Sequence, residues 1–158
     1  MNNSIISKFN NLKDYLQNAE GLTAEDFEGV TSETAYNESY NSFEVCGCEY
    51  LVFTDEEADE ATAAEIKENL WAFNPDFILQ HTKVYNETTD REDQAIIEAL
   101  REVQSRICET ANALVMALIE DLDVFISDAI SADGRGHFLA GYDGEEIESG
   151  EFYIYRIY

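Results

Sequence analysis

The sequence predicts an α+β protein, in which a small, mainly antiparallel sheet with a C-terminal hairpin packs against a long helix and several shorter helices. Apolar residues recur at the helical period over a long segment, from about residue 90 to residue 131. Runs of β-branched and aromatic residues lie before and after this segment. With 158 residues, 45% of them apolar, the chain can bury a core. We therefore expect one acidic domain over residues 1–158, with an N-terminal helix and acidic segment at 1–42 and the core at 43–158.

Two local patterns predict the first elements. Apolar residues at three- and four-residue spacing predict a helix over Ser4–Gln17. β-branched and aromatic residues predict a strand or a bent hairpin over Phe43–Thr54, in which Gly47 marks a turn or a bulge.

The segment Thr54-Asp-Glu-Glu57 has the form of a capping box, in which the Thr54 hydroxyl and the Glu57 carboxylate each accept from the other residue's backbone amide. It predicts a helix from Asp55 to about Phe73. Pro75 is the single proline of the chain, and proline suits the first position of a helix. We therefore expect a break before Pro75 and a short helix from there to Gln80.

The strongest periodic pattern runs from Ile96 to Phe125, where apolar residues recur every 3.6 positions on average. No Gly or Pro occurs between Arg91 and Asp133. A straight helix of roughly 40 residues would be about 60 Å long, which exceeds the width of about 40 Å expected for a compact domain of this size. We therefore expect either a kink near Ile119–Asp123 or an elongated molecule.

The last 22 residues predict a β-hairpin. His137–Tyr142 and Glu151–Tyr158 form its two strands, and the turn uses Asp143-Gly144 and Ser149-Gly150. Both faces of the second strand carry apolar side chains, so at least one face must lie on helices.

The net charge excludes several classes of partner. Nine Lys plus Arg against 34 Asp plus Glu give −25, so direct binding to DNA, RNA or an anionic membrane surface is not expected. The longest apolar run falls far short of about 20 residues, and Met1–Ser4 lacks the basic-then-apolar pattern of an export signal. We expect a cytoplasmic protein.

The cysteines and histidines do not predict a metal site or another cofactor. Cys46 and Cys48 are two residues apart in the predicted strand and Cys108 lies in the predicted long helix, so we expect reduced, buried thiols. Cys-Gly-Cys and the isolated His81 and His137 do not match the ligand spacing of structural zinc sites.

An enzyme would have to use Asp133-Gly-Arg-Gly-His137 with Tyr142-Asp143. Glycines beside Arg135 could let the backbone approach an anion, and His137 could act as an acid or a base. The same residues suit the end of a helix and the start of a hairpin, with Arg135 pairing a local acid. We favour this structural role and expect no catalytic residues.

Five segments between Glu49 and the C-terminus are distinctive: EYLVFTDEEADE (49–60), LWAFN (70–74), DAISADGRGH (128–137), YDGEE (142–146) and YIYR (153–156). Through these segments the chain resembles, from roughly Glu49 to the C-terminus, a group of small acidic proteins encoded by tailed bacteriophages. The resemblance implies a viral protein that acts in the cytoplasm of a bacterial host cell, and it implies no catalytic residue.

The acidic residues are concentrated rather than evenly spread. Between Lys13 and Lys67 there is no Lys or Arg over 53 residues, while 15 Asp or Glu occur there. Duplex DNA carries one charge per about 1.7 Å, so 25 charges correspond to about 42 Å of duplex. Composition and size are similar to those of phage DNA-mimic antirestriction proteins.

These observations predict an inhibitor that occupies the basic cleft of a host protein, such as a DNA-binding nuclease, a restriction enzyme or a CRISPR-type effector. The carboxylates expected to replace phosphates are those of Glu25, Asp26, Glu28, Glu56, Glu57, Asp59, Glu60, Glu65, Glu145, Glu146 and Glu148.

Two alternatives remain open. The chain could be a non-enzymatic phage accessory or protein-interaction module whose acidity serves solubility. It could also inhibit a host protein through aromatic anchors, namely Tyr36, Tyr40, Trp71 and the C-terminal tyrosines. Whether the chain forms a homodimer is open as well.

Overall fold

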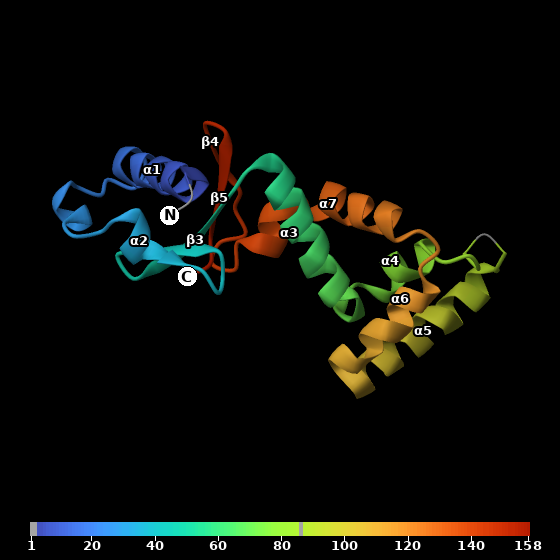
Figure 1. Cartoon of the computed structure of the whole chain (residues 1–158). Helices are drawn as coiled ribbons and strands as arrows, with labels where there is room; N and C mark the ends of the chain where they lie inside the picture. Colours follow the sequence, from blue (N-terminus) through green and yellow to red (C-terminus); the bar gives the residue numbers. More distant parts are fainter. Residues whose placement is uncertain (1–2, 86) are drawn as a thin grey trace. The chain divides into compact units, whose positions relative to one another are not determined.

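The fold is α+β, as predicted, in a computed structural model that describes residues 3–85 and 87–158. Met1 and Asn2, which belong to the segment where no export signal is expected, lie outside the described residues. The helices and strands follow one another as labelled in Figure 1: α1 (Asn3–Asn18), α2 (Ser32–Ala35), β1 (Tyr36–Asn37), β2 (Ser42–Val45), β3 (Cys48–Phe53), α3 (Asp55–Glu68), α4 (Pro75–Gln80), α5 (Asp90–Ile107), α6 (Asn112–Leu118), α7 (Leu122–Leu139), β4 (Ile147–Ser149) and β5 (Phe152–Arg156).

The chain, for which the sequence predicts one acidic domain, divides into two compact units. The sheet unit consists of Met1–Thr62 and Asp133–Tyr158, and the helical unit consists of Ala63–Ala132. The boundaries fall within α3 and within α7, where Gly134 breaks the helix with φ 77°. Each unit is described by itself.

The sheet has five antiparallel strands in the order β1-β2-β3-β5-β4. The hairpin predicted at Phe43–Thr54 is confirmed as β2 and β3. Val45 pairs with Cys48, and the two residues between them, Cys46 and Gly47, have φ of 53° and 75°. Two positive φ angles in a two-residue loop are typical of the type I′ turn, whose twist matches that of the strands.

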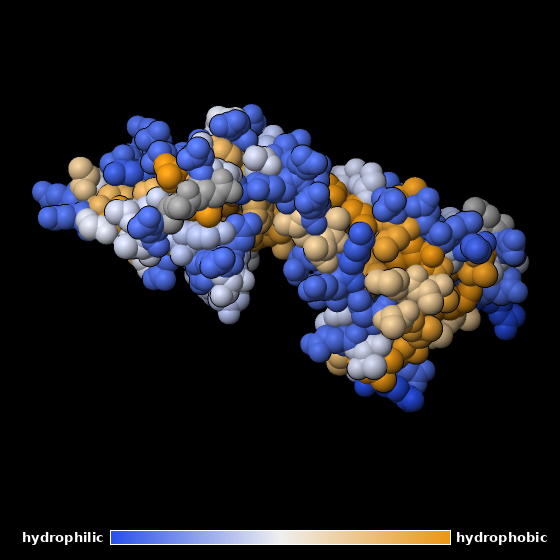
Figure 2. All heavy atoms as spheres, viewed as in Figure 1, coloured by the Kyte–Doolittle hydropathy of each residue, from blue (hydrophilic) through white to orange (hydrophobic). Residues whose placement is uncertain are grey.

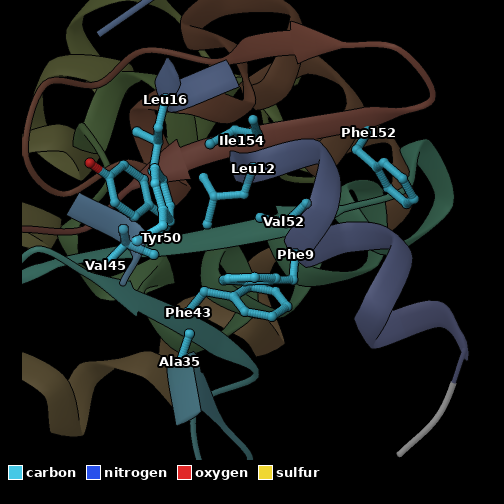
Figure 3. Close-up of a cluster of buried hydrophobic side chains, with 11 residues drawn as sticks. Phe9, Leu12, Leu16, Ala35, Phe43, Val45, Tyr50, Val52, Phe152 and Ile154 are labelled. Atoms are coloured by element: carbon cyan, nitrogen blue, oxygen red, sulfur yellow. The ribbon is translucent and has the colours of Figure 1, made fainter. Parts of the chain in front are cut away.

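Helix α1 covers one face of the sheet. Its residues Phe9, Leu12 and Leu16 pack on Phe43 and Val52 and on their neighbours in a shared core (Figure 3). Residues 90–131, where the sequence predicts the long helix, belong to the helical unit. The amphipathic pattern showed that α1 buries a face but did not show which element that face would contact.

The opposite face of the sheet is covered by the start of α3 and the end of α7. Phe53 and Tyr155 pack there on Ala58 and Ala140. The predicted capping box fixes the start of α3, since the Thr54 amide donates to the Glu57 carboxylate (2.8 Å) and the Glu57 amide to the Thr54 hydroxyl (3.3 Å). Helix α3 ends at Glu68, earlier than predicted, and a 3-10 turn follows at Leu70–Ala72.

The C-terminal hairpin is confirmed, but its first strand was placed wrongly. The strand is β4 at Ile147–Ser149, and the predicted arm at His137–Tyr142 is helical as far as Leu139. At Gly136 a Cβ would lie 2.4 Å from the carbonyl oxygen of Gly144. The helix end and the loop before β4 therefore approach each other so closely that only glycine fits at this position.

The helical unit contains α4, α5, α6 and most of α7. The short helix at Pro75–Gln80 is confirmed, with the Asn74 side chain accepting from the Asp76 amide. The long helix predicted at about 90–131 is present as the successive helices α5, α6 and the first part of α7. The expected break near 119–123 is present between α6 and α7, and a second break occurs at Cys108.

The second break lacks a signal in the sequence. Cys108 has φ 46° and ψ −128°, a conformation that costs energy for any residue other than glycine. The side chain of Asn112 holds the chain after the break, because its oxygen accepts from the Trp71 amide (3.0 Å) and its nitrogen donates to the Lys67 carbonyl (2.8 Å). These long-range bonds stabilise the change of chain direction between α5 and α6.

Candidate binding surface: the carboxylates of the sheet unit

The two units differ in charge. The sheet unit has 20 Asp or Glu against four Lys or Arg, a formal net charge of −16, and the helical unit has 14 against five, which gives −9. What the sheet unit offers a partner depends on whether its four cations are free.

Lys8 and Lys13 on α1 are both engaged within the unit. The Lys8 side chain is only 5% exposed, and its Nζ lies 2.7 Å from the Glu57 carboxylate and 5.7 Å from the ring centre of Phe53. Lys13 Nζ lies 5.0 Å from the ring centre of Phe27, a cation–π distance. Lys8 is therefore buried in an ion pair, whereas Lys13 is half-buried and keeps its charge over an aromatic ring.

Arg135 contacts three carboxylates. Its Nη1 donates to Asp55 (2.8 Å) and Asp59 (2.9 Å) on α3, and its Nε and Nη2 donate to the two oxygens of Glu146 (2.7 and 3.0 Å). The guanidinium lies 4.4 Å from the ring centre of Tyr153, and the side chain is 11% exposed. The bidentate bond to Glu146 is the strong geometry for Arg and carboxylate.

Arg156 on β5 is the fourth cation. Its Cζ lies 4.0 Å from the ring centre of Tyr142, its Nε donates to the Tyr158 carbonyl (2.9 Å), and its Nη2 lies 3.0 Å from the Cys48 sulfur. Each Lys and Arg of the sheet unit therefore contacts other groups of that unit, and the surplus of negative charge is left to solvent.

Two of the predicted surface acids are used internally. Burial opposes ionisation of Glu57, but hydrogen bonds from Lys8 and Thr54 outweigh it and lower the pKa of Glu57. Glu146 behaves in the same way, because bonds from Arg135 and from the Tyr155 hydroxyl (2.5 Å) lower its pKa despite burial. Their oxygens already have donors, so we leave these two residues out of the candidate surface.

The other predicted acids are exposed. Asp26 accepts from the amide and the hydroxyl of Thr23, and these bonds lower the pKa of Asp26, so it stays ionised. Asp59 remains exposed although it binds Arg135. Glu65 lies in the helical unit and accepts from the Asn69 side chain.

We define the free carboxylates as the predicted acids of the sheet unit that are exposed and whose side chains form no hydrogen bond or ion pair with other described residues. They are Glu25, Glu28, Glu56, Glu60, Glu145 and Glu148.

The prediction missed further exposed acids of the same unit. Glu33, Glu38, Glu44 and Glu151 are exposed and similarly have no side-chain partner among the described residues. They stand alone in the sequence, whereas the predicted acids were chosen from runs. The alternation of buried and exposed residues in β2 would have identified Glu44.

The segment Asp133–His137 has the predicted structural role. Arg135 pairs acids instead of facing an open anion site, and His137 is exposed beside the ring of Phe138. The three cysteines are free thiols, as expected, but the expectation that they are buried was wrong, because Cys46 and Cys108 are exposed and Cys48 is half-buried.

The aromatic anchors are only partly available. Tyr40 and Tyr158 are exposed, at 70% and 68%. Tyr155 is fully buried, and the ring of Tyr142 is stacked on Arg156. Trp71 is half-buried in the helical unit.

Comparison with protein-family models, with curated proteins and with solved structures finds no match to this chain. The function is therefore inferred from the geometry of the carboxylates and the charge of each unit. No helix within the described residues is both long and apolar enough to cross a membrane.

Proposed function

We propose that this chain is a phage-encoded inhibitor of a basic host protein that handles nucleic acid, and that carboxylates of its sheet unit replace DNA phosphates in the target's cleft. The supporting observation is that each Lys and Arg of that unit contacts other groups of the unit. Lys8 and Arg135 are paired with carboxylates of the unit, Lys13 and Arg156 lie against aromatic rings, and the exposed carboxylates face solvent on a unit of charge −16.

The physical basis is the chemistry of carboxylate and phosphate oxygens. Both accept charge-assisted hydrogen bonds from Arg and Lys, and both can bind Arg in a bidentate manner. Glu56 and Glu60 are one helical turn apart on α3, so they present two such acceptors on the same side of the helix. The field of the whole unit would also speed encounter with a positive cleft.

The proposal places the protein in the cytoplasm of a bacterial host, in line with the resemblance of residues from Glu49 onward to acidic phage proteins. A target among DNA-binding nucleases, restriction enzymes or CRISPR-type effectors fits, because each holds nucleic acid in a positive cleft. No cofactor, metal or catalytic residue enters this mechanism.

The test begins with capture of host proteins on the immobilised chain, followed by identification of those that bind and measurement of each one's enzymatic activity. A second chain carries Glu56→Gln with Glu60→Gln. These changes keep side-chain size and remove two charges from the sheet unit, so we expect the captured enzyme to bind about tenfold more weakly or worse.

The matched control carries Glu87→Gln with Glu98→Gln, which changes the net charge equally but lies in the helical unit, where both residues are exposed. Its binding should stay near that of the unchanged chain. Equal loss in both variants would mean that only total charge matters, and loss in neither would contradict the proposed surface.

A second candidate function is a protein-interaction module whose acidity serves solubility. The helical unit favours it through exposed apolar side chains, among them Ile107, Leu114 and Met116. In that case the binding partner would contact the helical unit, and the substitutions at Glu56 and Glu60 would leave its affinity unchanged.

A further inference from the structure

Helix α6 exposes most of its side chains although nearly all of them are apolar. Leu114 is 44% exposed, Met116 43% and Leu118 39%, and Val115 is the single residue of this helix that is buried. A helix that is apolar on all sides is normally enclosed by other protein. We call the exposed residues Ala113, Leu114, Met116, Ala117 and Leu118 the α6 surface.

The view in Figure 2 shows hydrophobic side chains gathered over α5 and α6. The α6 surface also borders a cavity of about 270 Å³ that lies within the helical unit. Its walls include Val84, Ile96, Leu100 and Leu118, and Lys83 and Glu120 are its charged residues. The helical unit thus offers protruding apolar side chains and, beside them, an apolar hollow.

The α6 surface lies in the middle of a segment without charge. Thr110–Ile119 contains no Asp, Glu, Lys or Arg, in a chain whose net charge is −25. A second copy of the chain is repelled by most of this molecule, and this segment is where two copies can approach without placing carboxylates against each other.

We propose that the α6 surface is the contact between two copies of this chain. In a twofold arrangement the same patch serves both copies, so a patch must offer both a protrusion and a recess. Leu114 and Met116 of one copy supply the protrusion, and the cavity beside Leu118 of the other copy receives it. Packing of ridges into hollows at three- and four-residue spacing is the usual geometry between helices.

A basic partner does not suit this contact. The α6 surface has no carboxylate that could pair with its cations, whereas the sheet unit has many. Self-association through α6 goes beyond the proposed function and does not depend on it, because the two contacts use different residues and different interactions.

Self-association through the α6 surface and binding of a basic partner through the sheet unit should respond to salt in opposite ways, so the two can be tested separately. Apolar association persists in salt, and salt also screens the repulsion between two copies, since the Debye length falls from about 10 Å at 0.1 M to about 3 Å at 1 M. We expect sedimentation velocity to show a dimer that strengthens between these two conditions. A chain that remains monomeric at about 1 M salt, at every concentration tested, would overturn the proposal.

A variant with Leu114→Ser and Leu118→Ser locates the contact. Both side chains are exposed, so the fold should persist, and circular dichroism together with fluorescence of Trp71 verifies this. We expect the dimer dissociation constant to rise by about tenfold or more. Tyr40→Ser, at an exposed aromatic of the sheet unit, is the control and should leave the dimer intact.

A proximity measurement covers the case in which the double variant does not fold. Met116→Cys is introduced into a chain whose Cys46, Cys48 and Cys108 are replaced by Ser, and mild oxidation should link two copies through position 116. The same change at Tyr40 should give no link. Linking at Tyr40 but not at Met116, or a Met116 link only to proteins other than this chain, would contradict the proposed contact.

Discussion

The sheet unit and the helical unit expose different kinds of side chain. The sheet unit covers both faces of its sheet with helices, keeps its four cations in internal contacts and exposes carboxylates. The helical unit carries less net charge, and it exposes Ile107, Leu114, Met116 and Leu118. The first composition suits a positive partner and the second suits an apolar one, so one chain can present two surfaces with opposite responses to salt.

The chain contains natural reporters for separating the two units. Trp71 is the single tryptophan and lies in the helical unit, while eight of the nine tyrosines lie in the sheet unit. Tryptophan fluorescence therefore reports unfolding of the helical unit, and the near-ultraviolet tyrosine signal reports mainly unfolding of the sheet unit.

The largest effect on stability is expected from Arg135→Gln. It leaves Asp55, Asp59 and Glu146 without their shared cation. We expect the free energy of unfolding of the sheet unit to fall by about 2 to 3 kcal/mol, between the values for buried and for exposed ion pairs, because Arg135 is mostly buried whereas Asp55 and Asp59 are exposed. Urea denaturation followed by the tyrosine signal measures this.

The matched control is Arg101→Gln in the helical unit, where Arg101 is exposed and has no hydrogen bond or ion pair with another described residue. This change should leave both signals unaltered. A similar loss from both substitutions would show that total charge, and not the contacts of Arg135, sets the stability of the sheet unit.

Lys8→Met should have the next largest effect. Methionine retains apolar contact in the core but cannot donate to Glu57, whose carboxylate then keeps only the bond from the Thr54 amide. We expect a loss of about 1.5 to 2 kcal/mol from the sheet unit, the low end for a hydrogen bond to a charged group, because the Glu57 side chain is partly exposed. Unchanged unfolding by the tyrosine signal would show that the buried ion pair merely balances its own desolvation cost.

Acidification should weaken the sheet unit. In the folded unit the pKa values of Glu57 and Glu146 lie below the usual 4.5, because hydrogen bonds to Lys8 and Arg135, among others, outweigh burial. The stability from these bonds is complete above pH 4.5 and is lost as the pH falls through the lowered values. Urea midpoints measured across this range test it. A sheet unit that becomes steadily more stable in acid would show that relief of carboxylate repulsion dominates instead.

The smallest effect on stability is expected from Glu56→Gln with Glu60→Gln. These like charges are four residues apart on α3, so their removal should stabilise the sheet unit by a few tenths of a kcal/mol. The same variant should lose partner binding. A loss of stability would mean that these carboxylates have structural contacts, and the binding test would then need Glu145 and Glu148 in their place.

Local signals in the sequence predicted those parts of the fold that depend on neighbouring residues. The capping box at Thr54, the turn at Gly47 and the helix that begins at Pro75 each follow from chemistry within a few positions, and each is confirmed. The break at Cys108 depends on bonds of Asn112 to residues more than 40 positions away, which no local pattern contains.

The same distinction holds for the candidate surface. Runs of acids identified where negative charge accumulates, but they could not show which carboxylates are free. Arg135 binds Asp55, which is 80 residues away in the sequence. Arg135 also binds Glu146, which for that reason is not among the free carboxylates. Pairing between distant segments depends on the topology of the sheet, so it becomes visible only in the folded unit.

The most direct test of the central claim is competition between DNA and this chain for the captured host protein. The dissociation constant of the complex is measured between about 0.05 and 0.2 M salt, with and without duplex DNA. If the sheet-unit carboxylates replace phosphates, binding weakens steeply with salt and DNA displaces the chain competitively. A complex that is indifferent to both salt and DNA would contradict the account.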